Sequence, residues 1–467
     1  MPPTVAELLA ALPIEDDERP AAEDALRDVL ARSSTRPVPT GRPRRLLALT
    51  TLQGRIAAAY LAWWLRQFFQ SRAAGAAALD ETHLRNAIRV LGSMGYLRGA
   101  AMKAGQILAA WPDVVPTEFA DVLGRLHFQA PPMHFELLRE FVRRELGDDP
   151  ERLFDDFTPE AFAAASLGQV HHARRVGTGE PLAIKIQYPN IAATIRSDMG
   201  LLETVTAPMR LGRDGDSLKE QLADIRRMLD REVDYEQEAD NLARARAVFT
   251  DGDDIVVPRV FADRSSSRVL TMDFLEGLHV QPFLDANPSQ ADRDRFGTLI
   301  TRAGMRMWYH AHLCYADVHP GNFLWMPDGR LGLIDFGCCH RFTPADIAYL
   351  TEVEAAVDGD EDAVRRAMLS AIGLDVPDDE ERLRLLDAYS RWLWEPVVRE
   401  GPFDFGDATY FRRGMEIYGE VLRRRFVRSR PVNTWIGRSF IGLRAILTQL
   451  GARVEYGGIL REETTMG

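Results

Sequence analysis

The stretch of residues 312–337 constrains the fold of this chain most, because it arranges three polar side chains around a short hairpin. Asp317 is followed five residues later by Asn322, and Asp335 stands directly before a Phe-Gly pair. The apolar residues between Asn322 and Asp335 indicate two short strands joined by a turn at Asp328. A hairpin brings its two ends together, so we expect Asn322 and Asp335 to lie close in space.

Oxygen ligands in this arrangement are typical of phosphoryl transfer. That reaction needs a carboxylate beside the incoming hydroxyl and hard oxygen ligands for Mg²⁺. We therefore predict that Asp317 positions the nucleophile and that Asn322 and Asp335 hold Mg²⁺. The alternative is a surface hairpin whose Asp and Asn side chains only cap turns. The spacing of the whole set favours the catalytic interpretation.

An alternating strand pattern upstream contains a candidate phosphate-binding lysine. The segment Leu-Ala-Ile-Lys-Ile-Gln matches the type of strand whose lysine grips nucleotide phosphates, and its lysine is Lys185. A buried ammonium without a partner is costly, so Lys185 requires a carboxylate. We choose Glu238, from an acidic helical pattern that begins near residue 230. Glu232 and Asp234 of that pattern can then pair with another basic residue, for which Lys103 is a candidate.

The segment before Lys185 occupies the place of a glycine-rich phosphate loop but is rich in alanine. Methyl groups there narrow the backbone's freedom and crowd a phosphate. Residues 154–157 are predicted as a first strand, with further strands at 255–260 and 268–274, the last ending in a hinge that contacts adenine. The predicted nucleotide-binding positions are Ala163, Ala164, Ala165, Ser166, Gly168, Val170 and Lys185, with the backbones of Met272 and Phe274.

Composition excludes several classes of protein. The 467 residues suffice for two or three domains, or for one catalytic fold with a large extension. A net charge of −12 disfavours nucleic acid as a partner. The three cysteines form neither a disulfide framework nor a zinc-binding spacing, and the start of the chain lacks a signal-peptide pattern. We therefore expect a reducing, cytoplasmic environment.

The sequence predicts no membrane-spanning helix, because no segment reaches about 18 uncharged apolar residues. The nearest candidate, residues 46–69, carries arginines and glutamines that are costly in hydrocarbon. It is interpreted as a buried amphipathic helix. The alternative is a helix on a membrane surface, anchored by its tryptophans and phenylalanines, which would give the protein a peripheral membrane location.

Together these segments resemble the AarF/UbiB-like atypical kinases, a family linked to ubiquinone biosynthesis. The resemblance covers about residues 85–345. It implies an α+β, protein-kinase-like bilobal fold, with a small antiparallel sheet lobe, a helical lobe and an N-terminal helical extension over the active site. The residues that carry it are Lys103 and Gln106 of a Lys-x-Gly-Gln motif, the alanine-rich segment, Lys185, Glu232, Asp234, Glu238, Asp317, Asn322 and Asp335.

The resemblance also implies a division of the chain and a role for the extension. In that picture Lys103 and Gln106 reach the place of a protein substrate and are held by Glu232 and Asp234. The expected parts are an N-terminal arm and linker at 1–44, the helical extension at 45–150, a kinase-like N-lobe at 151–277 and a helical C-lobe at 278–467.

The function implied is binding of ATP or ADP with Mg²⁺ and ATP hydrolysis in support of lipid or quinone metabolism, with a lipid or quinone precursor as a further partner. Ala316 stands where protein kinases usually have an arginine, and few residues separate Gly337 from the next helix, so a peptide has little room. One alternative is a small-molecule kinase of the aminoglycoside or choline type. The other is a non-catalytic, nucleotide-gated lipid-binding protein.

Overall fold

The computed structural model describes residues 135–165, 167–189, 191–193, 195–196, 199, 223, 226–227, 229–316, 318–357, 380–424 and 431–465. The predicted arm, residues 46–69, Lys103, Gln106, Ser166 and Asp317 lie outside the described residues. The chain divides into two compact units. Of the described residues, 161–169 and 187–233 belong to the smaller unit, and 135–160, 170–186 and 234–465 to the larger one.

In the smaller unit the alanine-rich segment forms a strand, β1 (Ala163–Ala165), where the sequence predicted a loop. Glycine-rich loops use backbone conformations that a methyl group penalises, so three alanines disfavour such a loop. The amide of Tyr188 donates to the carbonyl of Leu167 at 3.1 Å. The side chain of Gln187 donates to the carbonyl of Val233 at 2.6 Å. The first bond joins the two stretches of the smaller unit, and the second joins the ends of its longer stretch.

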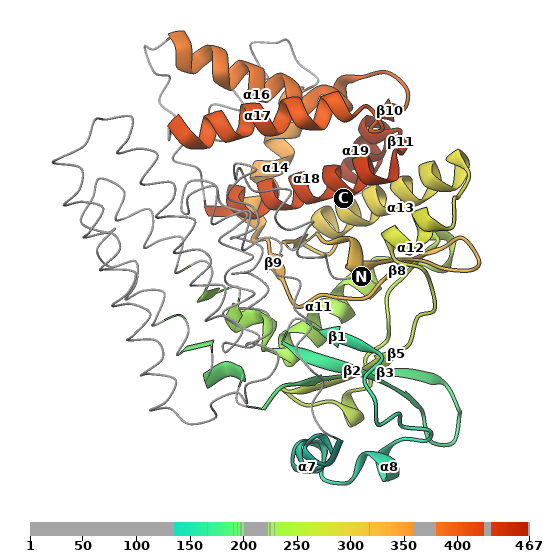
Figure 1. The fold of residues 1–467 in the computed structure, drawn as a ribbon. Coiled ribbons are helices and arrows are strands. Elements are labelled where there is room, and N and C mark those ends of the chain that lie inside the picture. Colours follow the sequence, from blue (N-terminus) through green and yellow to red (C-terminus); the bar gives the residue numbers. More distant parts are fainter. Residues whose placement is uncertain are drawn as a thin grey trace, which may run out of the picture. The chain divides into compact units, whose positions relative to one another are not determined.

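Strands β2 (Gly168–Arg174), β3 (Pro181–Gln187) and β5 (Val269–Asp273) are neighbours in that order in one sheet, and most of their residues belong to the larger unit (Figure 1). Every residue of β3 after Pro181 is buried. Strand β3 pairs with β5 so that Lys185 lies opposite Leu270. A central, buried strand therefore presents Lys185, as the alternating pattern predicted.

The predicted first strand at residues 154–157 is wrong. The chain instead forms α7 (Phe135–Leu146) and a short helical turn, α8 (Pro150–Leu153), followed by a single bridge between Asp155 and Arg174. Asp156 has a positive φ of 50°, which interrupts an extended run. Gly147, at φ 90°, follows the last residue of α7, a position where glycine commonly ends a helix.

The acidic segment is broken into two pieces, although the sequence predicted one continuous helix. Helix α11 (Tyr235–Ala247) begins only after Asp234, whose carboxylate accepts from the amide of Gln237 at 3.0 Å. This N-cap satisfies a helix donor and ends the preceding helical residues, which include Glu232. The buried face of α11 consists of Tyr235, Glu238, Asn241, Leu242 and Ala245, and the helix packs against β5.

The predicted strand at residues 255–260 contacts two sheets. Strand β4 (Ile255–Val256) pairs in parallel with β8 (Leu331–Leu333), which pairs antiparallel with β7 (Phe323–Trp325). Four residues after β4, Val260 bridges Met272 of β5. The segment thus links the sheet that carries Lys185 to the hairpin that precedes Asp335.

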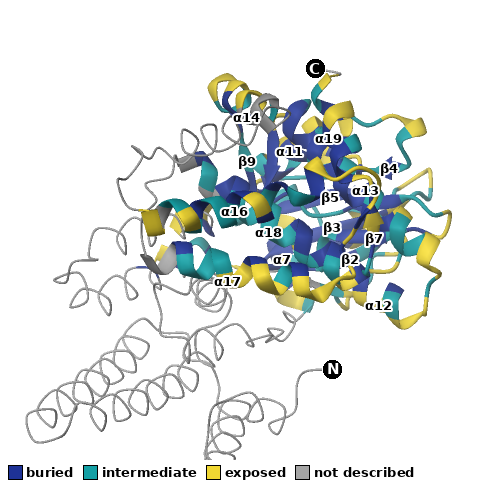
Figure 2. Cartoon of the chain, turned by 90° about the horizontal axis from the view of Figure 1, so that it is seen from above, coloured by how far each residue is buried: buried dark blue, intermediate teal, exposed yellow. Residues whose placement is uncertain are grey.

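Helices form most of the chain after β5. Helix α13 (Gln290–Tyr309) packs against the last helices and strand of the chain and against the strand that follows it. Figure 2 shows the buried residues gathered on α11, α13, α19, β3 and β5. The remaining elements are η3 (Asp251–Asp253), η4 (Ala262–Arg264), α12 (Val280–Asp285), β6 (Leu313–Tyr315), η5 (Pro320–Asn322), β9 (Cys339–Arg341), α14 (Pro344–Val357), α16 (Glu380–Val398), β10 (Phe403–Asp404), α17 (Ala408–Arg424), α18 (Pro431–Leu450), β11 (Arg453–Val454) and α19 (Tyr456–Thr465).

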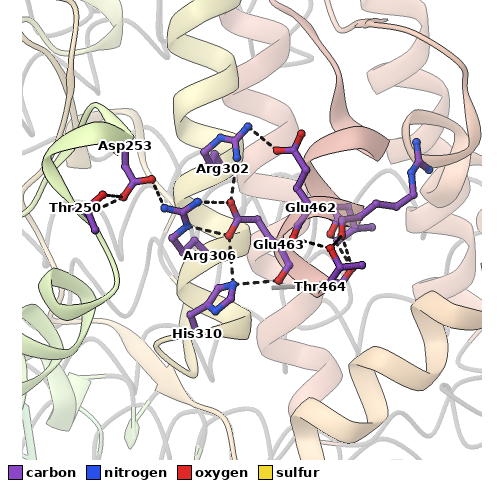
Figure 3. Close-up of polar contacts among 11 residues, drawn as sticks. Thr250, Asp253, Arg302, Arg306, His310, Glu462, Glu463 and Thr464 are labelled. Atoms are coloured by element: carbon purple, nitrogen blue, oxygen red, sulfur yellow. Dashed lines mark hydrogen bonds and ion pairs between the residues drawn. The ribbon is translucent and has the colours of Figure 1, made fainter. Parts of the chain in front are cut away.

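A buried group of ion pairs joins α13 to α19 (Figure 3). Arg306 donates to both carboxylate oxygens of Glu463, at 2.9 and 2.8 Å, and also contacts Asp253. Arg302 donates to Glu463 at 3.2 Å, and His310 contacts the Glu463 carbonyl at 3.0 Å. These contacts fix the helix that leads into residues 312–337.

None of the helices described is both long enough and apolar enough to cross a membrane.

Candidate nucleotide and metal site

The structure confirms the predicted pair of Lys185 and Glu238. The Lys185 ammonium donates to the two carboxylate oxygens of Glu238 at 2.8 and 2.9 Å. The Glu238 side chain is 0% exposed and that of Lys185 10%. Tyr235, one turn before Glu238 on α11, places its ring 5.1 Å from the ammonium, a distance suited to a cation–π contact. Residues of α11 therefore surround the lysine that β3 supplies.

Asp335 is the second carboxylate beside this ammonium. Its Oδ2 atom lies 3.6 Å from the Lys185 nitrogen, and its Oδ1 atom accepts from the amide of Gly337 at 3.0 Å. In contrast to Glu238, the Asp335 side chain is 39% exposed. One ammonium therefore faces two carboxylates, of which Asp335 remains accessible to a ligand.

The pKa shifts of the pair follow from burial and from this charge ratio. Burial lowers the pKa of Lys185, but the carboxylates of Asp335 and Glu238 outweigh burial and raise that pKa well above its usual range. Burial raises the pKa of Glu238 to about 7, against the pull of Lys185 and with the charge of Asp335 adding to the rise. The site holds more negative than positive charge, which is an environment that favours a bound cation.

The hairpin predicted around Asn322 and Asp335 is confirmed. Strands β7 and β8 pair so that Phe323 lies opposite Leu333, and the amide of Ile334 donates to the carbonyl of Asn322 at 3.2 Å. Asn322 thus ends η5 just before one strand, and Asp335 follows the other. The turn contains a glycine with a φ of 78° directly after Asp328.

Gly321 is required for a close approach to the preceding histidine. Its amide donates to Nδ1 of His319 at 3.0 Å, and a Cβ atom on Gly321 would lie 3.1 Å from the same nitrogen. That spacing is tighter than most Cβ contacts. A side chain at residue 321 would require the His319 ring to shift by a few tenths of an ångström.

The neighbours of Asp317 are held on two sides, while Asp317 itself lies outside the described residues. The amide of Ala316 donates to the carbonyl of Cys338 at 3.0 Å, and Arg438 of α18 donates to the Ala316 carbonyl at 3.3 Å. Val318 packs on Gly442 of α18 so closely that a Cβ atom on the glycine would lie 2.7 Å from the Val318 Cβ. Helix α18 therefore supports the segment that carries Asp317.

The predicted nucleotide-binding positions are distributed over both units. Strand β1 and Gly168 belong to the smaller unit, and Val170 to the larger one. Met272 lies within β5, opposite Ala183. The amide of Phe274 donates to the carbonyl of Pro181 at 3.0 Å. This bond uses the Phe274 donor, and the contact of the Met272 and Phe274 backbones with adenine stays a prediction.

The residues predicted to hold the extension are described only in part. Asp234 caps α11, and Glu232 belongs to the smaller unit. Because Lys103 and Gln106 lie outside the described residues, their pairing with these acids stays a prediction. Sequence reasoning missed Asn241 and Arg341, which bond each other beside Asp335. The signal for Asn241 was its position three residues after Glu238, on the same helix face.

The donor set suits Mg²⁺ better than a metal that requires a complete protein cage. Among the residues described, no three His, Cys, Asp or Glu side chains gather to hold an ion. Mg²⁺ is commonly bound by one or two protein oxygens, with phosphate oxygens and water completing its shell. The accessible Asp335 and the amide of Asn322 at the other end of the hairpin fit that pattern.

Comparison with known proteins gives a consistent result. Residues 125–368 match the ABC1 atypical kinase-like domain. The chain is 28% identical over 400 residues to the mitochondrial atypical kinase COQ8 of Schizosaccharomyces pombe, covering 83% of this chain and 64% of that protein. It is 28% identical over 431 residues to mitochondrial COQ8B of Danio rerio, covering 90% and 68%. It is 31% identical over 242 residues to ACTIVITY OF BC1 COMPLEX KINASE 1, chloroplastic, of Arabidopsis thaliana, covering 50% and 35%.

The fold comparison agrees with the bilobal, kinase-like α+β fold predicted from the sequence. A solved structure described as the complex of Rv3197 with erythromycin from Mycobacterium tuberculosis matches with a TM-score of 0.55 and 25% identity. The match covers 84% of this chain and 98% of that one. The chain spans about two thirds or less of the length of the curated relatives named above. Since the domain match covers more than half of the 467 residues, the chain belongs to the ABC1 atypical kinase-like family.

Proposed function

We propose that this protein is a Mg²⁺-dependent ATPase of the atypical-kinase type that supports lipid or quinone metabolism. The observation that carries the proposal is the triad of Lys185, Glu238 and Asp335, in which one ammonium contacts a buried carboxylate and an accessible one. A purely structural ion pair needs no second, exposed carboxylate. A nucleotide site needs a lysine for the phosphates and an accessible acid for the metal.

Each residue has a role that follows from its position. Lys185, held by Glu238, donates to phosphate oxygens, and the carbonyl of Phe274 accepts from the adenine edge. Asp335 and Asn322 hold Mg²⁺, which neutralises phosphate charge when bound. Asp317, between the supported residues Ala316 and Val318, orients a water molecule or takes a proton from an acceptor hydroxyl.

The connection after the metal-binding turn supports ATP hydrolysis over protein phosphorylation. Strand β9 ends at Arg341 and α14 begins at Pro344. The amide of Phe342, between them, donates to the carbonyl of His312 at 2.9 Å. A connection this short and firmly held offers a peptide substrate no docking segment. A lipid or quinone precursor at a membrane surface is therefore our proposed partner, in line with the family resemblance.

Substitution of the metal ligand tests the enzymatic part. Asp335→Asn keeps the size of the side chain and removes the charge, so we expect ATP hydrolysis to fall about 100-fold or more while the unfolding temperature stays close to that of the wild type. Asp328→Asn, at the turn of the same hairpin, is the control and retains turnover. Undiminished hydrolysis in the Asp335 variant would exclude the metal assignment. Adding liposomes and quinone-like phenols to the wild-type assay tests the proposed partner.

A small-molecule kinase is the second candidate. The observation that favours it is the structural neighbour described as a complex with erythromycin. Mass spectrometry of erythromycin and aminoglycosides incubated with the protein and Mg-ATP tests this candidate. A phosphorylated product would favour the small-molecule kinase over the ATPase. Release of phosphate only to water would exclude the small-molecule kinase.

A further inference from the structure

We propose that Asn241 is a positioning residue that ties the main chain of the metal-binding turn to helix α11. The proposal depends on the proposed function, because it concerns the same site. Asn241 lies three residues after Glu238 on the buried face of α11 and is 1% exposed. It touches neither the predicted phosphate position nor the predicted metal ligands, so its effect passes through the backbone of Phe336.

Both ends of the Asn241 amide are hydrogen bonded. Its Nδ2 atom donates to the carbonyl of Phe336 at 3.1 Å, and its Oδ1 atom accepts from Nε and Nη2 of Arg341, each at 3.0 Å. A carbonyl can only accept and a guanidinium can only donate. The two partners therefore fix the orientation of the amide, and no other neutral side chain of this size satisfies both.

The backbone of Phe336 is held from α11. Its carbonyl accepts from Asn241, and its main chain also acts on the Glu238 carboxylate, lowering the pKa of that group. Phe336 is fully buried and directly follows Asp335. Because the carbonyl that follows Asp335 in the main chain is bonded to α11, the direction of the Asp335 side chain depends on where α11 lies.

Arg341 extends this connection toward the catalytic segment. Besides Asn241 it contacts Asp240 of α11 at 2.6 Å. Arg341 lies in β9, opposite Leu313 of β6, and β6 ends two residues before Asp317. The hydroxyl of Tyr315 in β6 donates to the carbonyl of Asp335. Asn241 thus stands where α11, the metal-binding turn and the strand before Asp317 meet.

This arrangement couples the two halves of the site. Glu238 holds the lysine and Asn241 holds the turn with the metal ligand, and the two residues are neighbours on one helix face. A displacement of α11 would release Lys185 and redirect Asp335 together. Loss of the Asn241 donor would also leave the Phe336 carbonyl buried without its partner, which favours a rearranged turn.

Asn241→Asp isolates the bond to Phe336. The new carboxylate still accepts from Arg341, but it cannot donate to the Phe336 carbonyl and it repels that oxygen. We expect the Mg²⁺ concentration that gives half-maximal ATP hydrolysis to rise about tenfold and kcat to fall about tenfold, with a smaller change in KM for ATP at saturating Mg²⁺. A merely structural role would lower the unfolding temperature and leave the Mg²⁺ dependence unchanged.

The control makes the same chemical change elsewhere. Asn433 of α18 accepts from the hydroxyl of Tyr349 at 3.2 Å, and an aspartate retains that role. Asn433→Asp should therefore keep the wild-type Mg²⁺ dependence. If Asn241→Asp does not fold, Arg341→Lys is the second variant. It keeps the charge beside Asp240 and loses the paired bond to Asn241, so we expect a smaller shift, about threefold, in the same direction.

Hydrogen exchange tests the positioning without any turnover. Amides of residues 335–341 should exchange faster in Asn241→Asp than in the wild type or in Asn433→Asp. If the wild type hydrolyses no ATP, the proposed function fails, while the exchange experiment still decides the role of Asn241. A folded Asn241→Asp protein with wild-type exchange at these amides and wild-type Mg²⁺ dependence would overturn the inference.

Discussion

Two groups of charged side chains in the larger unit use similar residues for different purposes. Around Arg306, the buried carboxylate of Glu463 receives hydrogen bonds from two arginines, and Asp253 receives them from Arg306 and Thr250 (Figure 3). Around Lys185, a single ammonium faces two carboxylates. The Glu463 side chain is 0% exposed, whereas that of Asp335 is 39% exposed.

The difference teaches how a structural cluster can be told from a binding site. Where hydrogen-bond donors satisfy every carboxylate and water is excluded, the cluster offers no unsatisfied polar group to a further ligand. Where a carboxylate is accessible and the local charge is negative, a cation and its ligands supply what the protein lacks. We therefore expect substitutions at Lys185 to affect turnover most and substitutions at Arg306 to affect stability most.

The largest expected effect follows from removing the ammonium. In Lys185→Met, the phosphates lose their charged donor and Glu238 remains buried without its partner, so it takes up a proton. We expect ATP hydrolysis to fall about 10³-fold, which corresponds to about 4 kcal/mol of transition-state stabilisation. Steady-state kinetics at saturating Mg²⁺ measures the loss. Turnover near that of the wild type would remove Lys185 from the phosphate site.

The next largest effect is on folding. Arg306→Met removes the guanidinium from the partly buried Asp253 and from the buried Glu463, and breaking one partner of a buried pair typically costs about 3–5 kcal/mol. Because Arg302 still contacts Glu463, we expect a loss near about 3 kcal/mol in the free energy of unfolding. Denaturant titration measures it. At temperatures where the variant is folded, Mg-ADP affinity should stay unchanged; a weakened affinity would contradict the separation of the two clusters.

Sequence patterns predicted the Lys185 cluster and missed the Arg306 cluster for a physical reason. The hairpin before Asp335 and the strand of Lys185 follow from local periodicity, and a buried lysine near an acidic helix indicates its own partner. The bonds of Arg306 to Glu463 and of Arg341 to Asn241 join residues 157 and 100 positions apart. No local pattern fixes which arginine meets which acid at such separations.

The errors in the sequence analysis have local causes. Asp234 was predicted as one face of a continuous helix, yet its short carboxylate caps α11 and ends the helical run before it. The alanines at residues 163–165 were treated as a substitute loop because of their place in the chain. They form a strand instead.

Substitutions in α18, which supports the segment around Asp317, are expected to have a smaller effect on stability and turnover. A methyl group on Gly442 would meet Val318, whereas one on Gly437 of the same helix meets no described atom within 4 Å. Overpacking typically costs about 1–3 kcal/mol, so Gly442→Ala should lower stability by that amount and reduce kcat by displacing the neighbour of Asp317. Gly437→Ala should raise stability by up to about 1 kcal/mol. Equal effects of the two substitutions on kcat would contradict the role of α18.

The smallest expected effect is on the pH dependence of the free energy of unfolding, to which Glu238 and Asp253 should contribute with opposite signs. Burial gives Glu238 a raised pKa of about 7, so the folded protein binds a proton there that the unfolded chain, with the ordinary value of 4.5, does not. This group therefore adds stability as the pH falls from 7 to 5, by up to about 1 kcal/mol per pH unit.

Asp253 is expected to respond in the opposite direction. Burial raises its pKa, but hydrogen bonds from Thr250 and Arg306 outweigh burial and hold that pKa below its ordinary value of 3.8. Its contribution is therefore constant between pH 5 and 7 and is lost only as the pH falls below about 4. Unfolding free energies of the wild type, Glu238→Gln and Asp253→Asn, measured at several pH values, separate the two groups. If the Glu238 variant showed the same slope as the wild type between pH 5 and 7, the raised pKa would be wrong, and the Lys185 cluster would be as fully compensated as the Arg306 cluster.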